Sequence, residues 1–96
     1  MLSNFVLSRI RNTLRHDLGL VVSGYEFICE HPKLCICCYD DGIYCYDESG
    51  EQVDYYCDVD EVYLDNNGNY DKEMIISFIK NTKQKMLKKE IQNDFN

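Results

Sequence analysis

The fold is decided by residues 25–60, which read YEFICEHPKLCICCYDDGIYCYDESGEQVDYYCDVD. This stretch holds all six cysteines, most of the tyrosines and most of the acidic residues of a chain of 96 residues. Short runs of β-branched, aromatic and cysteine residues alternate with segments rich in Asp, Gly and Ser. That spacing is typical of short antiparallel strands joined by tight turns.

Four strands are predicted, near residues 25–30, 34–39, 43–47 and 52–58. The turns between them contain Pro32, Gly42 and Gly50, residues that favour tight reversals. A short lead-in over residues 20–24, with a bulge near its end, is a further candidate strand. The central segment therefore predicts an antiparallel meander of about four strands.

The turn at Asp41-Gly42 sets the register of the predicted sheet. If these two residues form the loop, Tyr39 pairs with Tyr44 and the rest of the hairpin follows. A three-residue loop through residues 40–42 would shift the pairing by one position. We favour the two-residue loop because it agrees with the pairing that the preceding hairpin implies, with Phe27 opposite Cys38.

Side chains alternate across a strand, so this register sorts the sheet into two faces. The face predicted to form the core contains Tyr25, Phe27, Cys29, Leu34, Ile36, Cys38, Ile43, Cys45, Val53, Tyr55 and Cys57. The opposite face contains Glu26, Ile28, Glu30, Cys35, Cys37, Tyr39, Tyr44, Tyr46, Asp54, Tyr56 and Asp58. We call the second set the outer face and expect it to meet water or a partner.

A helix is predicted on each side of this sheet in the sequence. In residues 1–19, apolar side chains recur every three or four residues, and three arginines lie on the other side of the predicted helix. Residues 69–90 repeat the helical period, with acidic residues at the start and lysines at later turns. The predicted fold is a single α+β domain over residues 1–96, with a sheet over 25–64 and the helices packed on one sheet face.

Charge is unevenly distributed along the chain. The net charge is −7, yet residues 25–73 hold 14 of the 17 acidic residues against only Lys33 and Lys72. An acidic surface repels nucleic acid and lipid headgroups and attracts basic partners. The N-terminus lacks a signal-peptide pattern and no apolar run reaches membrane-spanning length. We therefore expect a soluble, cytoplasmic protein that binds neither membranes nor nucleic acid directly.

The cysteines offer soft metal ligands, and Cys35, Cys37 and Cys38 form a C-x-C-C run. No C-x-x-C pair is present, and strand alternation splits the six thiols between two faces. We interpret them as reduced, structural thiols and predict no metal site. Residues 65–71 resemble a calcium loop, but its first and last ligand positions would be Tyr63 and Met74, so we interpret this segment as a turn and helix cap.

Catalysis has little support in the sequence. His16 lies on the first predicted helix beside Asp17 and His31 lies in a turn, and neither accompanies a recognisable nucleophile. Pairs of carboxylates are expected by chance among so many acidic residues. We therefore predict no enzymatic activity, no catalytic residue and no cofactor.

The outer face supports a more specific functional hypothesis, because tyrosines interleaved with carboxylates are suited to a protein–protein interface. Carboxylates spaced along strands and turns can take the place of DNA phosphates in a basic groove. The residues predicted to bind such a partner are Asp40, Asp41, Tyr44, Tyr46, Asp47, Glu48, Glu51, Asp54, Tyr56, Asp58, Asp60 and Glu61. The expected partner is a basic nucleic-acid-binding protein.

The small size, acidity, helix–meander–helix order and Asp-Asp-Gly turn at residues 40–42 together resemble anti-CRISPR proteins, small phage or mobile-element inhibitors of Cas nucleases. The resemblance implies a monomeric or homodimeric inhibitor that occupies the Arg- and Lys-lined site where a Cas9-type nuclease holds DNA. Three alternatives stay open: an antitoxin or immunity protein neutralising a basic toxin, a metal- or redox-responsive cysteine module, and a structural component that dimerises through a sheet edge.

Overall fold

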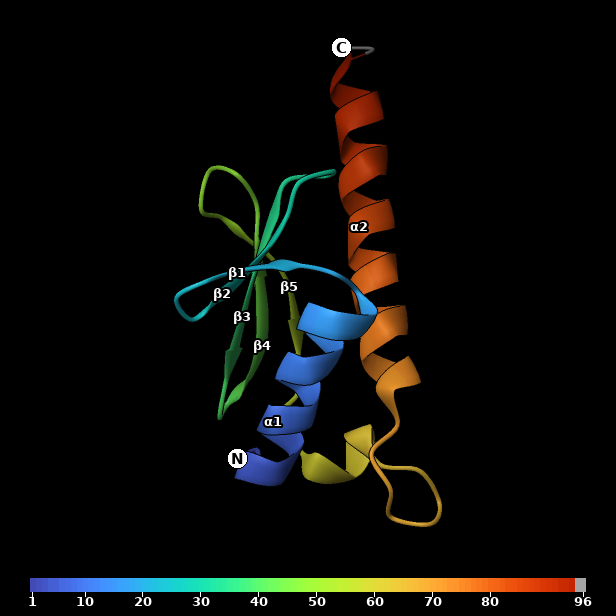
Figure 1. The fold of residues 1–96 in the computed structure, drawn as a ribbon. Helices are drawn as coiled ribbons and strands as arrows, with labels where there is room; N and C mark the ends of the chain where they lie inside the picture. The colour runs from blue at the N-terminus through green and yellow to red at the C-terminus, as the bar shows by residue number, and fades with distance from the viewer. Residues whose placement is uncertain (95–96) are drawn as a thin grey trace.

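The computed structural model describes residues 1–94 of the chain, with the side chains of residues 1–89. Two helices pack on the same side of an antiparallel sheet (Figure 1). The elements are α1 (Asn4–Asn12), the π-helical turn η1 (Thr13–Asp17), β1 (Val21–Ser23), β2 (Glu26–Cys29), β3 (Leu34–Tyr39), β4 (Gly42–Tyr46), β5 (Gln52–Tyr56), the 3-10 turn η2 (Asp60–Tyr63) and α2 (Lys72–Asp94). The predicted α+β fold, with helix, meander and helix in that order, is confirmed.

The sheet has five strands rather than about four, in the order β1-β2-β3-β4-β5. The fifth strand, β1, lies within residues 20–24, the further candidate strand of the sequence, and pairs with β2 at an antiparallel edge of the sheet. All three of its residues are exposed, with Val21 at 58% and Val22 at 45%. The alternation of buried and exposed residues that marks a strand in sequence is therefore missing from β1.

The first helix is shorter than the predicted span of residues 1–19. Ser3 caps α1 by accepting a hydrogen bond from Val6 N–H (3.3 Å), and the chain continues beyond Asn12 as the π-helical turn. Thr13 Oγ1 lies 2.8 Å from the Tyr70 hydroxyl, which ties this turn to the segment before α2. The apolar stripe of α1 is buried through Val6 and Ile10.

The register of the β3–β4 hairpin differs from the prediction by two residues. Tyr39 pairs with Gly42 rather than Tyr44, so Asp40 and Asp41 form the loop. The β2–β3 hairpin is shifted in the same way, with Phe27 opposite Ile36 instead of Cys38. Because side chains alternate with a period of two, a shift of two residues leaves the side chains of β2, β3 and β4 on their predicted faces. Tyr25, predicted in the core, instead lies in the turn before β2 and is 85% exposed.

The prediction for β5 is wrong, because a β-bulge interrupts its pairing with β4. Cys45 pairs with Asp54, but the next residue of β4, Tyr46, pairs with Gln52. One extra residue in β5 reverses the faces beyond it. Asp54 and Tyr56 therefore point toward the helices, and Tyr55 points to the outer face.

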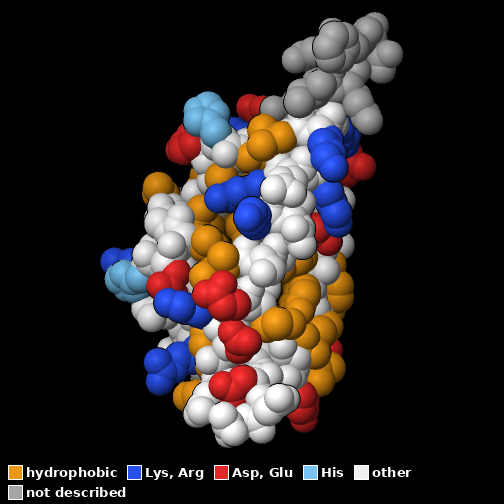
Figure 2. Space-filling view, turned by 90° about the vertical axis from the view of Figure 1, so that its right-hand side faces the viewer, with side chains coloured by type: hydrophobic (Ala, Val, Ile, Leu, Met, Phe, Trp, Pro, Cys, Tyr) orange, Lys and Arg blue, Asp and Glu red, His pale blue; other side chains and the backbone are white. Residues whose placement is uncertain are grey.

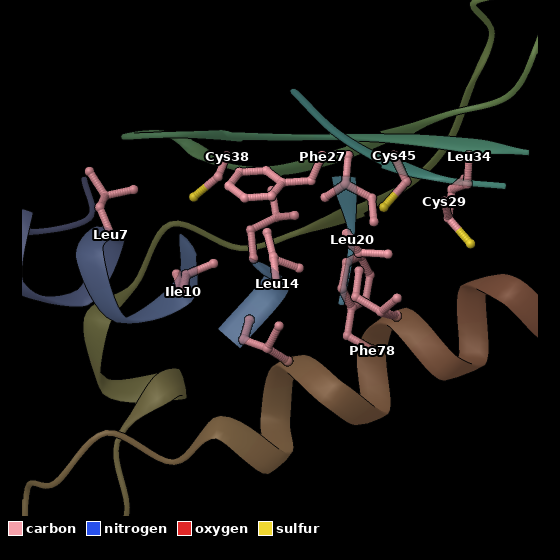
Figure 3. Close-up of a cluster of buried hydrophobic side chains, with 14 of the residues drawn as sticks. Leu7, Ile10, Leu14, Leu20, Phe27, Cys29, Leu34, Cys38, Cys45 and Phe78 are labelled. Atoms are coloured by element: carbon pink, nitrogen blue, oxygen red, sulfur yellow. The ribbon is translucent and has the colours of Figure 1, made fainter. Parts of the chain in front are cut away.

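The core lies between the sheet and the two helices (Figure 3). From the sheet, Phe27, Leu34 and Cys45 point toward the helices. From the helices, Leu14 and Phe78 point back.

The segment between β5 and α2 is not part of the sheet, although the prediction extended the sheet to residue 64. Instead η2 buries Tyr63, and Leu64 forms an isolated bridge with Tyr70. In the loop that follows, Asp65 Oδ1 accepts hydrogen bonds from the N–H groups of Asn67 and Asn69.

The second helix begins at Lys72 rather than residue 69. Asp71 Oδ1 accepts a hydrogen bond from Glu73 N–H at the start of this helix. The interpretation of residues 65–71 as a turn and helix cap matches these contacts. Among the described residues, neither helix combines the length and apolar character needed to cross a bilayer.

Candidate partner-binding face

Four tyrosines form a continuous cluster on the outer face of β3, β4 and β5. Tyr44 lies at its centre, with ring-centroid distances of 5.8 Å to Tyr39, 6.4 Å to Tyr46 and 5.0 Å to Tyr55. Tyr39 is 47% exposed and Tyr55 is 42% exposed. We call these four residues the tyrosine face. Tyr39, Tyr44 and Tyr46 were predicted on this face, whereas Tyr55 was predicted in the core.

The β3–β4 turn holds two of these rings in place. The Tyr44 hydroxyl donates to Asp41 Oδ2 (2.9 Å), and the Tyr55 hydroxyl donates to the Asp41 carbonyl oxygen (2.9 Å). The hydrogen bond to Asp41 raises the pKa of Tyr44 to about 12. Burial, with the charges of Asp58 and Asp41, raises the pKa of Tyr55. Both tyrosines are therefore neutral donors at physiological pH.

Carboxylates flank the tyrosine face at the β3–β4 end of the sheet. Asp40 and Asp41 are exposed in the turn. The N-terminus lies beside them, because Leu2 N–H donates to the Asp40 carbonyl oxygen (2.6 Å). The terminal amino group is 3.4 Å from Asp58 Oδ2 and offsets part of the local negative charge.

The predicted residues Asp60 and Glu61 lie in η2. The Asp60 carboxylate accepts a hydrogen bond from Ser3 N–H (3.0 Å) and so holds the start of the chain. Glu61 is exposed. The first residues of the chain thus contact both η2, through Ser3, and the β3–β4 turn, through Leu2, but η2 is not part of the sheet.

A second group of carboxylates lies in the β4–β5 turn, at the other end of the sheet (Figure 1). Asp47 Oδ1 accepts hydrogen bonds from Ser49 Oγ (2.6 Å), Ser49 N–H (2.9 Å) and Glu51 N–H (2.9 Å). These bonds, led by the one from the Ser49 hydroxyl, lower the pKa of Asp47. Asp47 therefore shapes the turn, while Glu48 and Glu51 are exposed to solvent.

Two predicted site residues, Asp54 and Tyr56, lie on the helix side of the sheet instead. Asp54 Oδ2 accepts hydrogen bonds from Thr82 Oγ1 (2.7 Å) and Lys85 Nζ (3.2 Å) of α2. The Tyr56 ring lies 4.8 Å from the Phe78 ring, centroid to centroid. The bulge before these residues is the physical reason, and their contacts fasten α2 to the sheet.

Replacing Asp54 with asparagine is expected to destabilise the protein by about 1–2 kcal/mol at pH 7, because the charged acceptor for Thr82 and Lys85 is lost. Burial alone would raise the pKa of Asp54, but its hydrogen bonds from Thr82, Tyr55 N–H and Lys85 outweigh burial and hold the pKa below its ordinary value. The carboxylate therefore stabilises the fold above the unfolded-state pKa of about 3.9, and this stabilisation is lost as the pH falls through the folded-state pKa.

Urea denaturation of wild type and Asp54→Asn at a series of pH values checks this expectation. The difference in unfolding free energy should shrink as the pH falls below about 4. Asp40→Asn, at an exposed turn position, serves as the control and should change stability by less than about 0.5 kcal/mol throughout. A difference for Asp54→Asn that stays constant down to the acid limit would contradict the assigned role.

The helix side carries charges of both signs. Lys and Arg side chains are interspersed with Asp and Glu on the side where α2 lies (Figure 2). Between α1, η1 and the β1–β2 hairpin lies an open groove of about 650 Å³ that is lined by Arg9, Arg11, Arg15 and His16. No acidic residue lines this groove. Five acidic residues, Asp40, Asp41, Asp47, Glu48 and Glu51, thus lie in the two turns at the ends of the tyrosine face, while others lie in η1, in the loop before α2 and in α2.

Three potential metal ligands also meet on the outer face. The carboxylate of Glu26 and the thiols of Cys35 and Cys37 each offer one ligand atom, and these atoms all lie within 4.8 Å of one another. Burial raises the pKa of Cys35 to about 12, with further contributions from the adjacent Cys37 and from a hydrogen bond to Glu26. The sequence showed the C-x-C spacing, but the contribution of Glu26 depends on the pairing of β2 with β3.

No protein family, curated protein or solved structure matches this chain. The class of protein is therefore defined by its own fold and surface. It is a small α+β protein with an antiparallel meander whose outer side presents a tyrosine cluster between two acidic turns. Its function has to be inferred from the chemistry of that face.

Proposed function

We propose that this protein is a non-enzymatic inhibitor that binds a nucleic-acid enzyme, in particular a Cas9-type nuclease, and competes with DNA for its basic groove. The tyrosine face and the two flanking acidic turns form the binding surface. The observation that carries the proposal is the fixed tyrosine cluster around Tyr44, bordered by exposed carboxylates at both ends of β4.

The spacing of the acidic turns suits a groove that holds DNA. The five residues of β4 separate the turns by about 17 Å, at about 3.3–3.4 Å per residue. A duplex of that length carries about ten phosphate charges, one for every 1.7 Å of axis. The two turns place fewer charges at the ends of this distance: Asp40, Asp41, Asp47, Glu48 and Glu51. The remaining affinity would have to come from the tyrosines.

The tyrosines are suited to that role because their rings are already ordered. Tyr44 and Tyr55 are both anchored on Asp41, so little conformational freedom is lost when a partner binds. Aromatic side chains with a hydroxyl group combine a large apolar contact area with a hydrogen bond and are enriched among the residues that dominate binding energy. A basic groove rich in arginine can pack its guanidinium groups on such rings.

The proposal is tested by mixing the purified protein with a panel of Cas9-type nucleases loaded with guide RNA. We expect a stoichiometric complex with at least one nuclease, loss of PAM-containing duplex binding, and an affinity that falls steeply with salt. The double variant Asp40→Lys, Glu51→Lys reverses one exposed charge at each end of the face. It should weaken the complex by at least about tenfold, because like charges then face the groove.

Matched controls separate the face from general acidity. Glu73→Lys reverses one exposed charge on α2, half of the charge change of the double variant, and should bind as the wild type does, whereas Asp40→Lys alone, which makes the same change on the face, should weaken binding. Tyr46→Ala should weaken binding by at least about tenfold, whereas Tyr25→Ala, at an 85% exposed position of the β1–β2 turn, should not. Absence of binding across the panel, or binding that leaves DNA loading and cleavage unchanged, would overturn the proposal.

A further inference from the structure

We propose that Glu26, Cys35 and Cys37 form a binding site for one thiophilic divalent cation, with Zn²⁺ as the intended ligand. The site lies on the outer face of β2 and β3. It has two thiol sulfurs and one carboxylate oxygen, all within 4.8 Å of one another. The site lies on the same face as the proposed partner-binding surface, but it is tested on the isolated protein, so its failure and the failure of the inhibitor function are distinguishable.

The strand register explains why these residues meet. Glu26 on β2 is the direct cross-strand partner of Cys37 on β3. Cys35 precedes Cys37 by two residues and therefore points to the same face of the sheet. The other cysteines of the sheet, Cys29, Cys38 and Cys45, lie in the core on the opposite face. The thiols of Cys35 and Cys37 thus lie apart from the cysteines of the core and close to the Glu26 carboxylate.

The distances suit a tetrahedral ion. With bonds of about 2.3 Å to sulfur and about 2.0–2.2 Å to oxygen, ligand atoms around Zn²⁺ lie roughly 3.5–3.8 Å apart. The cluster is wider than that by at most about 1 Å. Rotation of the exposed Glu26 side chain adjusts its carboxylate oxygen, and small changes in the χ1 angles of the two cysteines adjust the sulfurs, so the gap can close without moving the sheet.

The ligand set selects the class of cation. Thiolates favour Zn²⁺ and related soft or borderline metals, whereas Mg²⁺ and Ca²⁺ favour sites built only from oxygen. Binding releases the thiol protons of Cys35 and Cys37 to solvent, and the dication then offsets the charges of the two thiolates and the carboxylate. Three protein ligands leave one tetrahedral position free, and solvent can reach the site because Glu26 is exposed and Cys35 is half-exposed. Water or a side chain of a partner would complete the coordination.

A disulfide between the two cysteines fits the strand less well. Residues two apart in a strand have Cα atoms about 6.6–6.8 Å apart, at the upper limit of the range for disulfides. A shared metal ion tolerates a sulfur separation of about 3.8 Å, well beyond the S–S bond of about 2.05 Å. The extended conformation of β3 therefore favours a metal over a covalent bond.

The test uses the full chain, fully reduced and free of metal, titrated with Co²⁺ and then with Zn²⁺ against a chromophoric chelator. We expect one equivalent of metal per chain and a thiolate-to-cobalt charge-transfer band that Zn²⁺ abolishes. Glu26→Gln should weaken binding by at least about tenfold and keep the band, whereas Cys35→Ser should weaken binding and remove about half of its intensity. Cys37→Ser should behave as Cys35→Ser does.

Cys57→Ser is the matched control, because Cys57 is also half-exposed but lies outside the cluster. It should bind both metals as the wild type does. The proposal is overturned if the reduced protein takes up no stoichiometric metal, if Cys35→Ser and Glu26→Gln bind as tightly as wild type, or if Cys57→Ser removes the charge-transfer band. Cys37 is 3% exposed, so if Cys37→Ser fails to fold, Cys35→Ser and Glu26→Gln decide the outcome.

Discussion

Replacing Tyr63 with alanine is expected to destabilise the protein by about 4 kcal/mol, within the range measured when large core aromatics are truncated. Tyr63 is fully buried in η2 and is the largest of the fully buried side chains among the described residues. Its ring packs 5.4 Å from the Tyr56 ring, centroid to centroid, and its hydroxyl donates to the Cys57 carbonyl oxygen. The side chain therefore joins the end of β5 to the segment that leads into α2.

Two further variants separate packing from hydrogen bonding at this position. Tyr63→Phe keeps the ring but leaves the Cys57 carbonyl oxygen without its hydroxyl donor, so a cost of about 1–2 kcal/mol is expected. Tyr25→Ala removes a tyrosine that is 85% exposed and should change stability by less than about 0.5 kcal/mol.

Urea or thermal unfolding measures these differences. One kcal/mol corresponds to about 4–8 °C in Tm for a domain of this size, so Tyr63→Ala should lower Tm by roughly 16 °C or more. If Tyr63→Ala and Tyr25→Ala unfold at similar urea concentrations, η2 does not fasten β5 to α2 as the structure indicates.

The hairpins show why the sequence predicted the fold and most of the faces. Turn residues at 31–33 and 40–42 mark the reversals, and alternation in residues 34–39 assigns Ile36 and Cys38 to the core. The predicted register of these hairpins differs from the structure by two residues. The assignment of side chains to the two faces is nevertheless correct, because alternation repeats every two residues. Local patterns therefore fix which side of β3 and β4 is buried, even when they misplace the turn.

Strand β5 shows where local patterns fail. The alternation in residues 52–58 is equally compatible with either face, since Tyr55 and Tyr56 are both amphipathic. The choice is made by the bulge opposite Cys45 and Tyr46, and by contacts of Asp54 with Thr82 and Lys85. Residues about 30 positions away in the sequence decide this orientation, so no window around β5 contains the information.

The sequence predicted only part of the candidate site, because alternation along a strand can be predicted locally whereas the pairing of two strands cannot. Tyr44 and Tyr46 lie on the outer face as expected, because β4 keeps its alternation. The cysteines were interpreted as split between two faces, which is correct, but one of those faces also brings Glu26 beside Cys35 and Cys37. That cluster depends on the pairing of β2 with β3, which the predicted register placed two residues away.

Replacing Gly42 with alanine is expected to destabilise the protein by about 3 kcal/mol or more. Gly42 has a φ of 138°, a conformation that L-residues rarely adopt. A Cβ built here would lie 2.5 Å from the Tyr56 carbonyl oxygen and 2.6 Å from Tyr55 Cε2. The carbonyl belongs to the sheet backbone, so β4 and β5 would have to separate at the position where the tyrosine face is anchored.

Gly50→Ala isolates the steric part of this effect. Gly50 also has a positive φ, 87°, but a Cβ there would meet no atom within 4 Å. Gly50→Ala should therefore lower the unfolding free energy only by the cost of a positive φ in an L-residue, about 1–2 kcal/mol. In urea denaturation, Gly42→Ala should be the less stable variant by at least about 1 kcal/mol, since it adds a backbone clash to the same strain. Equal decreases in unfolding free energy for the two variants would mean that β5 can move away from Gly42 at little cost. The Tyr55 ring would then be held less firmly than its hydrogen bond to Asp41 indicates.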